Sequence, residues 1–312
     1  MRNLLVAVIV LGVGGYFGAK FYVQYKTAQD LDAVLTQARP MVDIAYENVV
    51  ATLSGELRVE SVTIRMPQFD DAVTIESVGL QTPGFMFLLG FDQRKLEMPE
   101  HLGVVLTGVR MSADADFMRE LDAAQATKAR SVELTPADKC ATSYGFTPAA
   151  LRELGYDELV VDIGMNFRRE GSQLVVGFGA DVEDMYGVDV ELTLAGISDP
   201  TALARGVRPL LAGGRIDYVD RSLNDRIMKY CTELEVTPED VIAAQLREVH
   251  TLARDYGMEL DALIIQPYTD FLLGKQRFTL IAQPPRPVDL TQLSLYKPSD
   301  VPNLLNLTAE AI

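Results

Sequence analysis

Hydrophobic and polar residues alternate along much of this chain with the period of two that is typical of β-strands. The alternating segments form one group of four before residue 112, a second group of four between residues 156 and 220, and one more near the C-terminus. A Glu170-Gly171 turn joins the first two segments of the second group into a predicted hairpin. The predicted strands are 42–53, 57–66, 73–80, 102–111, 156–168, 174–183, 188–195, 215–219 and 276–281.

Other segments carry apolar residues at the three- and four-residue spacing of amphipathic helices. The clearest of these follows Thr237, a favourable N-cap, and has Pro238 in its first turn, where proline is tolerated. Gly257 marks its end. The predicted helices of the second half are 199–211, 222–231, 238–256 and 259–272.

Three predicted strands share a pattern in which the apolar phase shifts by one residue at a small residue. It occurs at 59–64, 75–80 and 106–111. Because a β-bulge shifts the phase in this way and bends its strand, the pattern predicts a curved antiparallel sheet. The order of three strands, a connection, a strand and a helix also recurs, and it ends at Ser112–Leu121 in the first half and at Ser222–Cys231 in the second. This recurrence predicts a duplication.

The expected fold class is α+β, with an N-terminal transmembrane helix followed by a curved, mostly antiparallel sheet with helices, arranged as two duplicated β-rich units. The proline content after residue 283 predicts an extended C-terminal strap. The expected divisions are a transmembrane anchor and stalk helix at 1–39, a first β-rich unit at 40–126, a linker at 127–139, a second α+β unit at 140–282 and the strap at 283–312.

The segment Leu4–Val23 is an apolar run that only Lys20 interrupts. A helix of this length spans about 30 Å, the thickness of the hydrocarbon core of a bilayer. A cleaved signal peptide is the alternative, but Phe17 stands where cleavage after Ala19 requires a small residue. The run therefore predicts an uncleaved signal anchor. We expect a single-pass protein of a bacterial inner membrane, with its N-terminus in the cytoplasm and its body in the periplasm.

Gly14 and Gly18 lie about one helical turn apart within this run. Such pairs of small residues allow two membrane helices to approach closely, so they are candidates for helix association in a homodimer. Chance recurrence of glycine in a glycine-rich apolar segment is the alternative interpretation. The N-terminal helix would also make membrane lipid a partner of the chain.

The formal net charge of −16 restricts the other partners. Residues 1–26 contain three basic residues and no acidic one, so the rest of the chain is more acidic still. An acidic surface repels phosphate backbones and anionic lipid headgroups. We therefore expect no nucleic-acid partner.

The chain has two cysteines, Cys140 and Cys231. An even number of cysteines in an exported chain favours a disulfide. The bond would close a loop of about 90 residues and, on the chain-entropy model, stabilise the fold by roughly 4–5 kcal/mol. Two unpaired buried thiols are the alternative.

The sequence contains no GxSxG, HExxH, P-loop or CxxC motif. His101 and His250 stand far apart, without a neighbouring pattern of metal ligands. In the acidic cluster that ends at Asp225, a regular strand places Asp217 and Asp220 on opposite faces, so they would not converge on a metal. Helix capping and an ion pair explain this cluster. We therefore expect no enzyme activity, no cofactor and no metal.

One apolar segment lies outside the predicted strands, between Pro83 and the charged run 92–97. It is either a core-facing helix that caps the sheet or an exposed patch that contacts a bilayer, an acyl chain or a partner. Burying several such side chains is worth several kcal/mol, so their exposure would need a functional reason. The candidate ligand- or membrane-contact residues are Phe85, Met86, Phe87, Leu88, Leu89 and Phe91.

The apolar span, the acidic body and the repeated strand pattern together resemble the membrane-anchored periplasmic proteins of the AsmA-like and YdgA-like kind. The resemblance covers mainly residues 1–111 and is one of architecture, without a shared motif. It implies curved sheets that form apolar grooves, as in the lipid-handling members. This chain is short for such a groove, and its helix-rich region after Ser222 departs from the pattern.

Together these observations predict a non-enzymatic envelope protein, anchored in the inner membrane, that binds a hydrophobic ligand, a lipid or an envelope protein partner. Binding would bury apolar surface along the concave face of the sheet, with the segment 85–91 as a lid or a membrane contact. One alternative is a structural or assembly subunit of a membrane complex. The other is a hydrolase whose site the sequence does not reveal.

Overall fold

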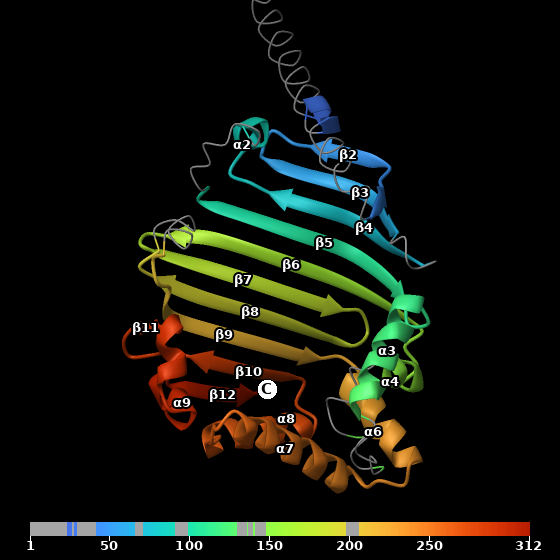
Figure 1. Cartoon of the computed structure of the whole chain (residues 1–312), viewed down its shortest axis with the longest axis vertical. Coiled ribbons are helices and arrows are strands. Elements are labelled where there is room, and N and C mark those ends of the chain that lie inside the picture. Colours follow the sequence, from blue (N-terminus) through green and yellow to red (C-terminus); the bar gives the residue numbers. More distant parts are fainter. Residues whose placement is uncertain are drawn as a thin grey trace, which may run out of the picture. The chain divides into compact units, whose positions relative to one another are not determined.

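The computed structural model divides the chain into two compact units, Met1–Val109 (unit 1) and Arg110–Ile312 (unit 2). Each unit is described by itself (Figure 1). The structure describes residues 24–26, 28–29, 42–65, 71–90, 99–129, 136, 140, 148–197 and 206–312.

Within these residues, no helix is both long and apolar enough to cross a membrane. The helix α7 (Pro238–Asp255), for example, has 18 residues but carries charged residues along its length. This finding contradicts the predicted transmembrane fold class, and with it the location as a single-pass inner-membrane protein with a periplasmic body. The predicted anchor Leu4–Val23, with Gly14 and Gly18, lies outside the described residues. The described fold consists instead of antiparallel strand pairs with several helices.

Unit 1 contains antiparallel strand pairs and a short helix. Its strands follow the order β1-β3-β4-β5, and β2 also pairs with β3. Val59, Val62 and Ile75 are buried between these strands and neighbouring apolar residues, which include Ala28. The elements are β1 (Asp43–Ala45), β2 (Asn48–Ala51), β3 (Glu56–Arg65), β4 (Ala72–Gln81), α2 (Phe85–Gly90) and β5 (His101–Ser112), whose last residues belong to unit 2.

The phase shift that predicted bulged strands has a different cause in β3. Glu60 pairs with Ser77 and Val62 pairs with Ile75, so the register between β3 and β4 passes this point without an extra residue. Ser61, which lies at the shift, has a positive φ of 55°. A residue in this left-handed region redirects the next side chain. A conformational change at one residue therefore moves Val62 onto the buried face, and the bulge prediction is wrong here.

Unit 2 contains a larger set of strands, and short turns join β6 to β7 and β7 to β8. The strands β6 to β9 lie side by side in chain order, followed by β10 and β12, and every pair is antiparallel (Figure 1). The short strand β11 pairs with β9. The strands are β6 (Glu158–Glu170), β7 (Gln173–Val182), β8 (Tyr186–Ala195), β9 (Leu210–Asp220), β10 (Arg277–Ala282), β11 (Val288–Asp289) and β12 (Leu307–Ala311).

The helices of unit 2 lie in groups between the strands along the chain. The predicted cap of α7 is present, because the Thr237 side chain accepts a hydrogen bond from the backbone N–H of Asp240 at 3.2 Å. The predicted helix 199–211 is wrong at its end, where Leu210 and Leu211 belong to β9; residues 199–205 lie outside the described part. The other helices are α3 (Asp116–Ala129), α4 (Pro148–Glu153), α6 (Leu223–Glu233), α8 (Ala262–Leu272) and α9 (Val301–Leu304).

The C-terminal region is not the extended strap that its prolines predicted. It contains two 3₁₀ helices, Leu290–Leu295 and Pro298–Asp300, before α9. It then ends in β12, which pairs with β10 from Phe278–Ala311 to Ala282–Leu307. The backbone polar groups of the last strand are thus satisfied by the sheet.

The main core of unit 2 lies where α4, α6 and α7 meet one end of the sheet. It contains Leu151, Ile227 and Val241 from the helices and Val182 from β7. Cys140 and Cys231 form a disulfide within this core, with their Cα atoms 5.9 Å apart and both residues fully buried. The predicted cysteine pair therefore joins the residue 140 region to α6.

Candidate functional site

The sheet of unit 2 has one face that is apolar across several strands. The register places Met165 opposite Phe178, Phe178 opposite Val190, and Val190 opposite Ile216. Because alternate residues of a strand point to the same face, their apolar neighbours two positions away share that face. We define the apolar face by Val161, Ile163, Met165, Phe167, Leu174, Val176, Phe178, Ala180, Val182, Tyr186, Val188, Val190, Leu192, Leu194, Ile216, Tyr218, Phe278 and Leu280.

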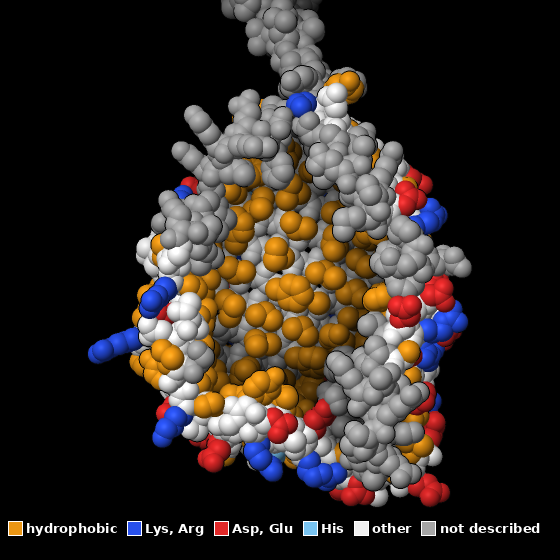
Figure 2. All heavy atoms as spheres, in the orientation of Figure 1, with side chains coloured by type: hydrophobic (Ala, Val, Ile, Leu, Met, Phe, Trp, Pro, Cys, Tyr) orange, Lys and Arg blue, Asp and Glu red, His pale blue; other side chains and the backbone are white. Residues whose placement is uncertain are grey.

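The middle of the apolar face is open to solvent. Met165 is 57% exposed, Phe178 44%, Ile216 39% and Leu192 36%. Figure 2 shows hydrophobic side chains gathered over the strands β6 to β9, on a face that is hollowed. Scattered exposed apolar residues are ordinary, but four on one face of four adjacent strands form a contiguous patch.

The helix α8 covers the end of this face that lies on β9 and β10. Phe271, on α8, is 5% exposed and has its ring centroid 5.4 Å from that of Tyr218 and 6.1 Å from that of Phe278. Tyr268, also on α8, packs edge-on against Phe278 at 5.7 Å. Edge-to-face pairs at these distances are favourable, so α8 forms a fixed aromatic wall.

A second wall closes the face near the turn between β6 and β7. Leu174, Leu194 and Leu211, from three neighbouring strands, are buried together with Ile197. Leu290, from the first 3₁₀ helix, packs against this cluster. The exposed residues therefore lie between two buried apolar groups.

Polar groups occur at the covered end of the face. The Asp220 side chain accepts a hydrogen bond from the backbone N–H of Asn224 at 3.1 Å, which fulfils the predicted capping role. Burial raises the pKa of the Asp220 carboxyl, and burial also raises the pKa of the Tyr218 hydroxyl. Arg221 pairs with Asp181, and Arg226 donates to the carbonyl oxygen of Gly155 at 3.0 Å.

The opposite face of the same strands is polar. Arg168 donates to Glu191 at 3.1 Å, and Arg215 binds Asp217, with Nη2 2.8 Å from Oδ1. Thr279 also donates to Asp217, at 2.6 Å, and the hydrogen bonds from Arg215 lower the pKa of this carboxyl most. Most of these charged side chains are partly exposed, and each pairs with a partner of opposite charge. This arrangement is typical of a solvated face.

Glycines on the polar face make room for these side chains. A Cβ on Gly177 would lie 2.9 Å from the side chain of Asn166, and one on Gly179 would lie 2.8 Å from Oδ1 of Asp189. The two glycines therefore allow the neighbouring polar side chains to lie across the sheet. On β7, the polar face thus has glycine at positions 177 and 179, whereas the apolar face has the larger side chains of Val176 and Phe178.

The predicted contact segment 85–91 does not form one uniform patch. Leu88 is 6% exposed and buried with Ala51, and Phe85 packs against them, whereas Met86 is 68% exposed. Phe87 is half-buried. Phe91 lies outside the described residues, and the structure describes the backbone of Leu89 but not its side chain.

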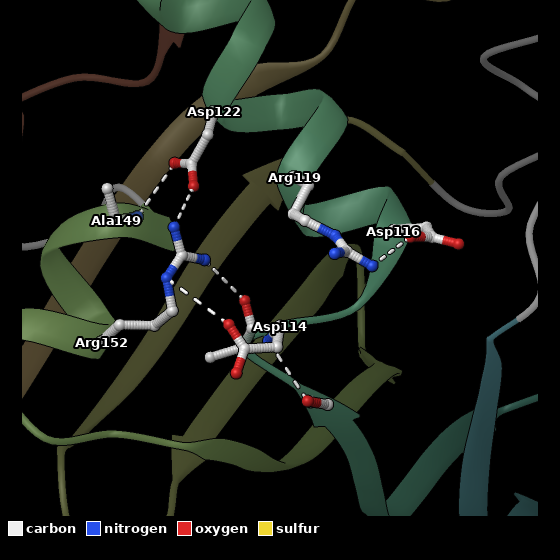
Figure 3. Close-up of polar contacts among 8 residues, drawn as sticks. Asp114, Asp116, Arg119, Asp122, Ala149 and Arg152 are labelled. Carbon is white, nitrogen blue, oxygen red and sulfur yellow. Dashed lines mark hydrogen bonds and ion pairs between the residues drawn. The ribbon is translucent and has the colours of Figure 1, made fainter.

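Acidic residues near α3 and α4 have structural roles (Figure 3). Arg152 pairs with Asp122 at 2.6 Å and with Asp114 at 3.7 Å, while Asp122 also accepts from the backbone N–H of Ala149 at 2.9 Å. Asp116 pairs with Arg119 within α3. Among the described residues, no group of three or more His, Cys, Asp or Glu is placed to hold a metal ion.

The sequence predicted binding along the concave face of the sheet, but no residue of the apolar face was named, although the signal is present in the printed sequence. In β6, Val161, Ile163 and Met165 alternate with Asp162 and Gly164. The same alternation runs through β7 and β8. Only the register shows that these residues lie opposite one another, and only the tertiary packing shows that their centre is exposed.

A family model described as "Uncharacterized protein" matches residues 179–312. The matched segment begins within β7 and contains Leu192 and Ile216 of the apolar face, while Met165 and Phe178 precede it. No curated protein matches the chain.

Proposed function

We propose that the protein is a non-enzymatic binding protein that holds a hydrophobic ligand on the apolar face of unit 2. The observation that carries this proposal is the exposure of Met165, Phe178 and Ile216 on adjacent strands of one face. Fully burying such a side chain is worth about 1.5–3 kcal/mol, so a folded sheet that leaves them in water forgoes part of that energy. A ligand that covers them would recover it.

The two walls support a small ligand rather than a large flat partner. Phe271 and its aromatic neighbours lie on one side of the exposed residues of the apolar face, and the Leu174 cluster lies on another. A hollowed apolar site that is bounded in this way is typical of small-molecule sites. The ligand would be held by apolar contact, because the charged residues of these strands lie mainly on the polar face.

Two adjacent residues of β6 provide a matched test. Met165 lies on the apolar face and Asn166 on the polar face, and both are exposed. We expect the full-length protein to bind the apolar fluorophore Nile red saturably. Met165→Asp should weaken this binding by at least about tenfold, because a charge would be desolvated under the ligand. Asn166→Asp adds the same charge on the other face and should bind like the wild type.

Thermal unfolding of both variants separates binding from stability. Since Met165 is 57% exposed, Met165→Asp should cost less than about 1 kcal/mol of stability. Equal affinity of the two variants for Nile red would contradict the proposal. So would native mass spectrometry in which a protein in fixed ratio, and no small molecule, accompanies the purified chain.

A further inference from the structure

We draw no further inference here: the strongest candidate, the cavity of about 360 Å³ on the polar face of unit 2, is lined by glycines and by arginines that already pair with Glu191 and Asp217, and nothing among the described residues shows what would occupy it.

Discussion

Two positions on β7 show how differently one sheet face can be used. Val182 and Phe178 lie four residues apart on the same strand and the same apolar face. Val182 is 6% exposed and packs in the core with Leu223 and Ile227 of α6, whereas Phe178 is 44% exposed. The strand geometry is the same at both positions, so the difference arises from the helices that cover one end of the face.

This difference separates stability from binding within one unit. The covered end provides the buried apolar area that stabilises the fold, with the disulfide inside it. The exposed residues of the apolar face add little to stability because their side chains remain partly in water. Substitutions at the two places should therefore have opposite consequences, and the following experiments use this contrast.

Removing the disulfide should have the largest effect on stability. Cys140 and Cys231 are 91 residues apart, so Cys231→Ser frees a long loop in the unfolded chain and should cost about 4 kcal/mol. Urea unfolding with and without reductant measures this loss. The double variant Cys140→Ser/Cys231→Ser should show no greater loss than the single one, apart from small packing effects. An unchanged urea midpoint would show that the covered end does not depend on this bond.

Truncating one side chain in the covered core should lower stability and spare Nile red affinity. Truncating one on the exposed part of the apolar face should do the opposite. Ile227→Ala removes a core side chain that is 3% exposed and should cost about 2–4 kcal/mol, without loss of Nile red affinity in the folded protein. Phe178→Ala should cost less than about 1 kcal/mol and weaken Nile red binding at least about fivefold. Urea unfolding and fluorescence titrations of both variants test this prediction. A larger loss of stability in Phe178→Ala than in Ile227→Ala would contradict it.

Much of unit 2 could be predicted from local sequence patterns. Alternation placed the strands β6 to β8, and Thr237 and Gly257 marked the ends of α7, because these signals depend on neighbouring residues alone. The end of the helix predicted at 199–211 failed, since Leu210 and Leu211 are apolar neighbours that fit either a helix or a buried strand.

The site could not be predicted in the same way. The apolar density of the segment around Leu88 suggested exposure as one of two options, but its packing on Ala51 depends on a strand more than thirty residues earlier. Conversely, the exposure of Ile216 depends on where α8 stops, and α8 begins at Ala262. Exposure is thus a property of long-range packing, whereas alternation is local.

The smallest effect concerns pH, where two aspartates of β9 differ because they lie on opposite faces. The pKa of Asp217 is lowered by its hydrogen bonds with Arg215, so its contribution to stability is present above about pH 4 and is lost as pH falls through the folded-state pKa. Asp217→Asn should therefore be destabilising at neutral pH, with a difference from the wild type that shrinks in acid.

Asp220 should behave in the opposite sense. Burial raises its pKa, so the folded protein holds this proton more tightly than the unfolded chain, and stability falls as pH rises from about 4 through the folded-state pKa. Asp220→Asn keeps an oxygen that can accept from Asn224 and removes the charge, so the variant should lose this decline. Urea midpoints measured across the acid range test both variants together. If both substitutions changed the pH dependence of the urea midpoint in the same direction, the predicted difference between Asp217 and Asp220 would be wrong.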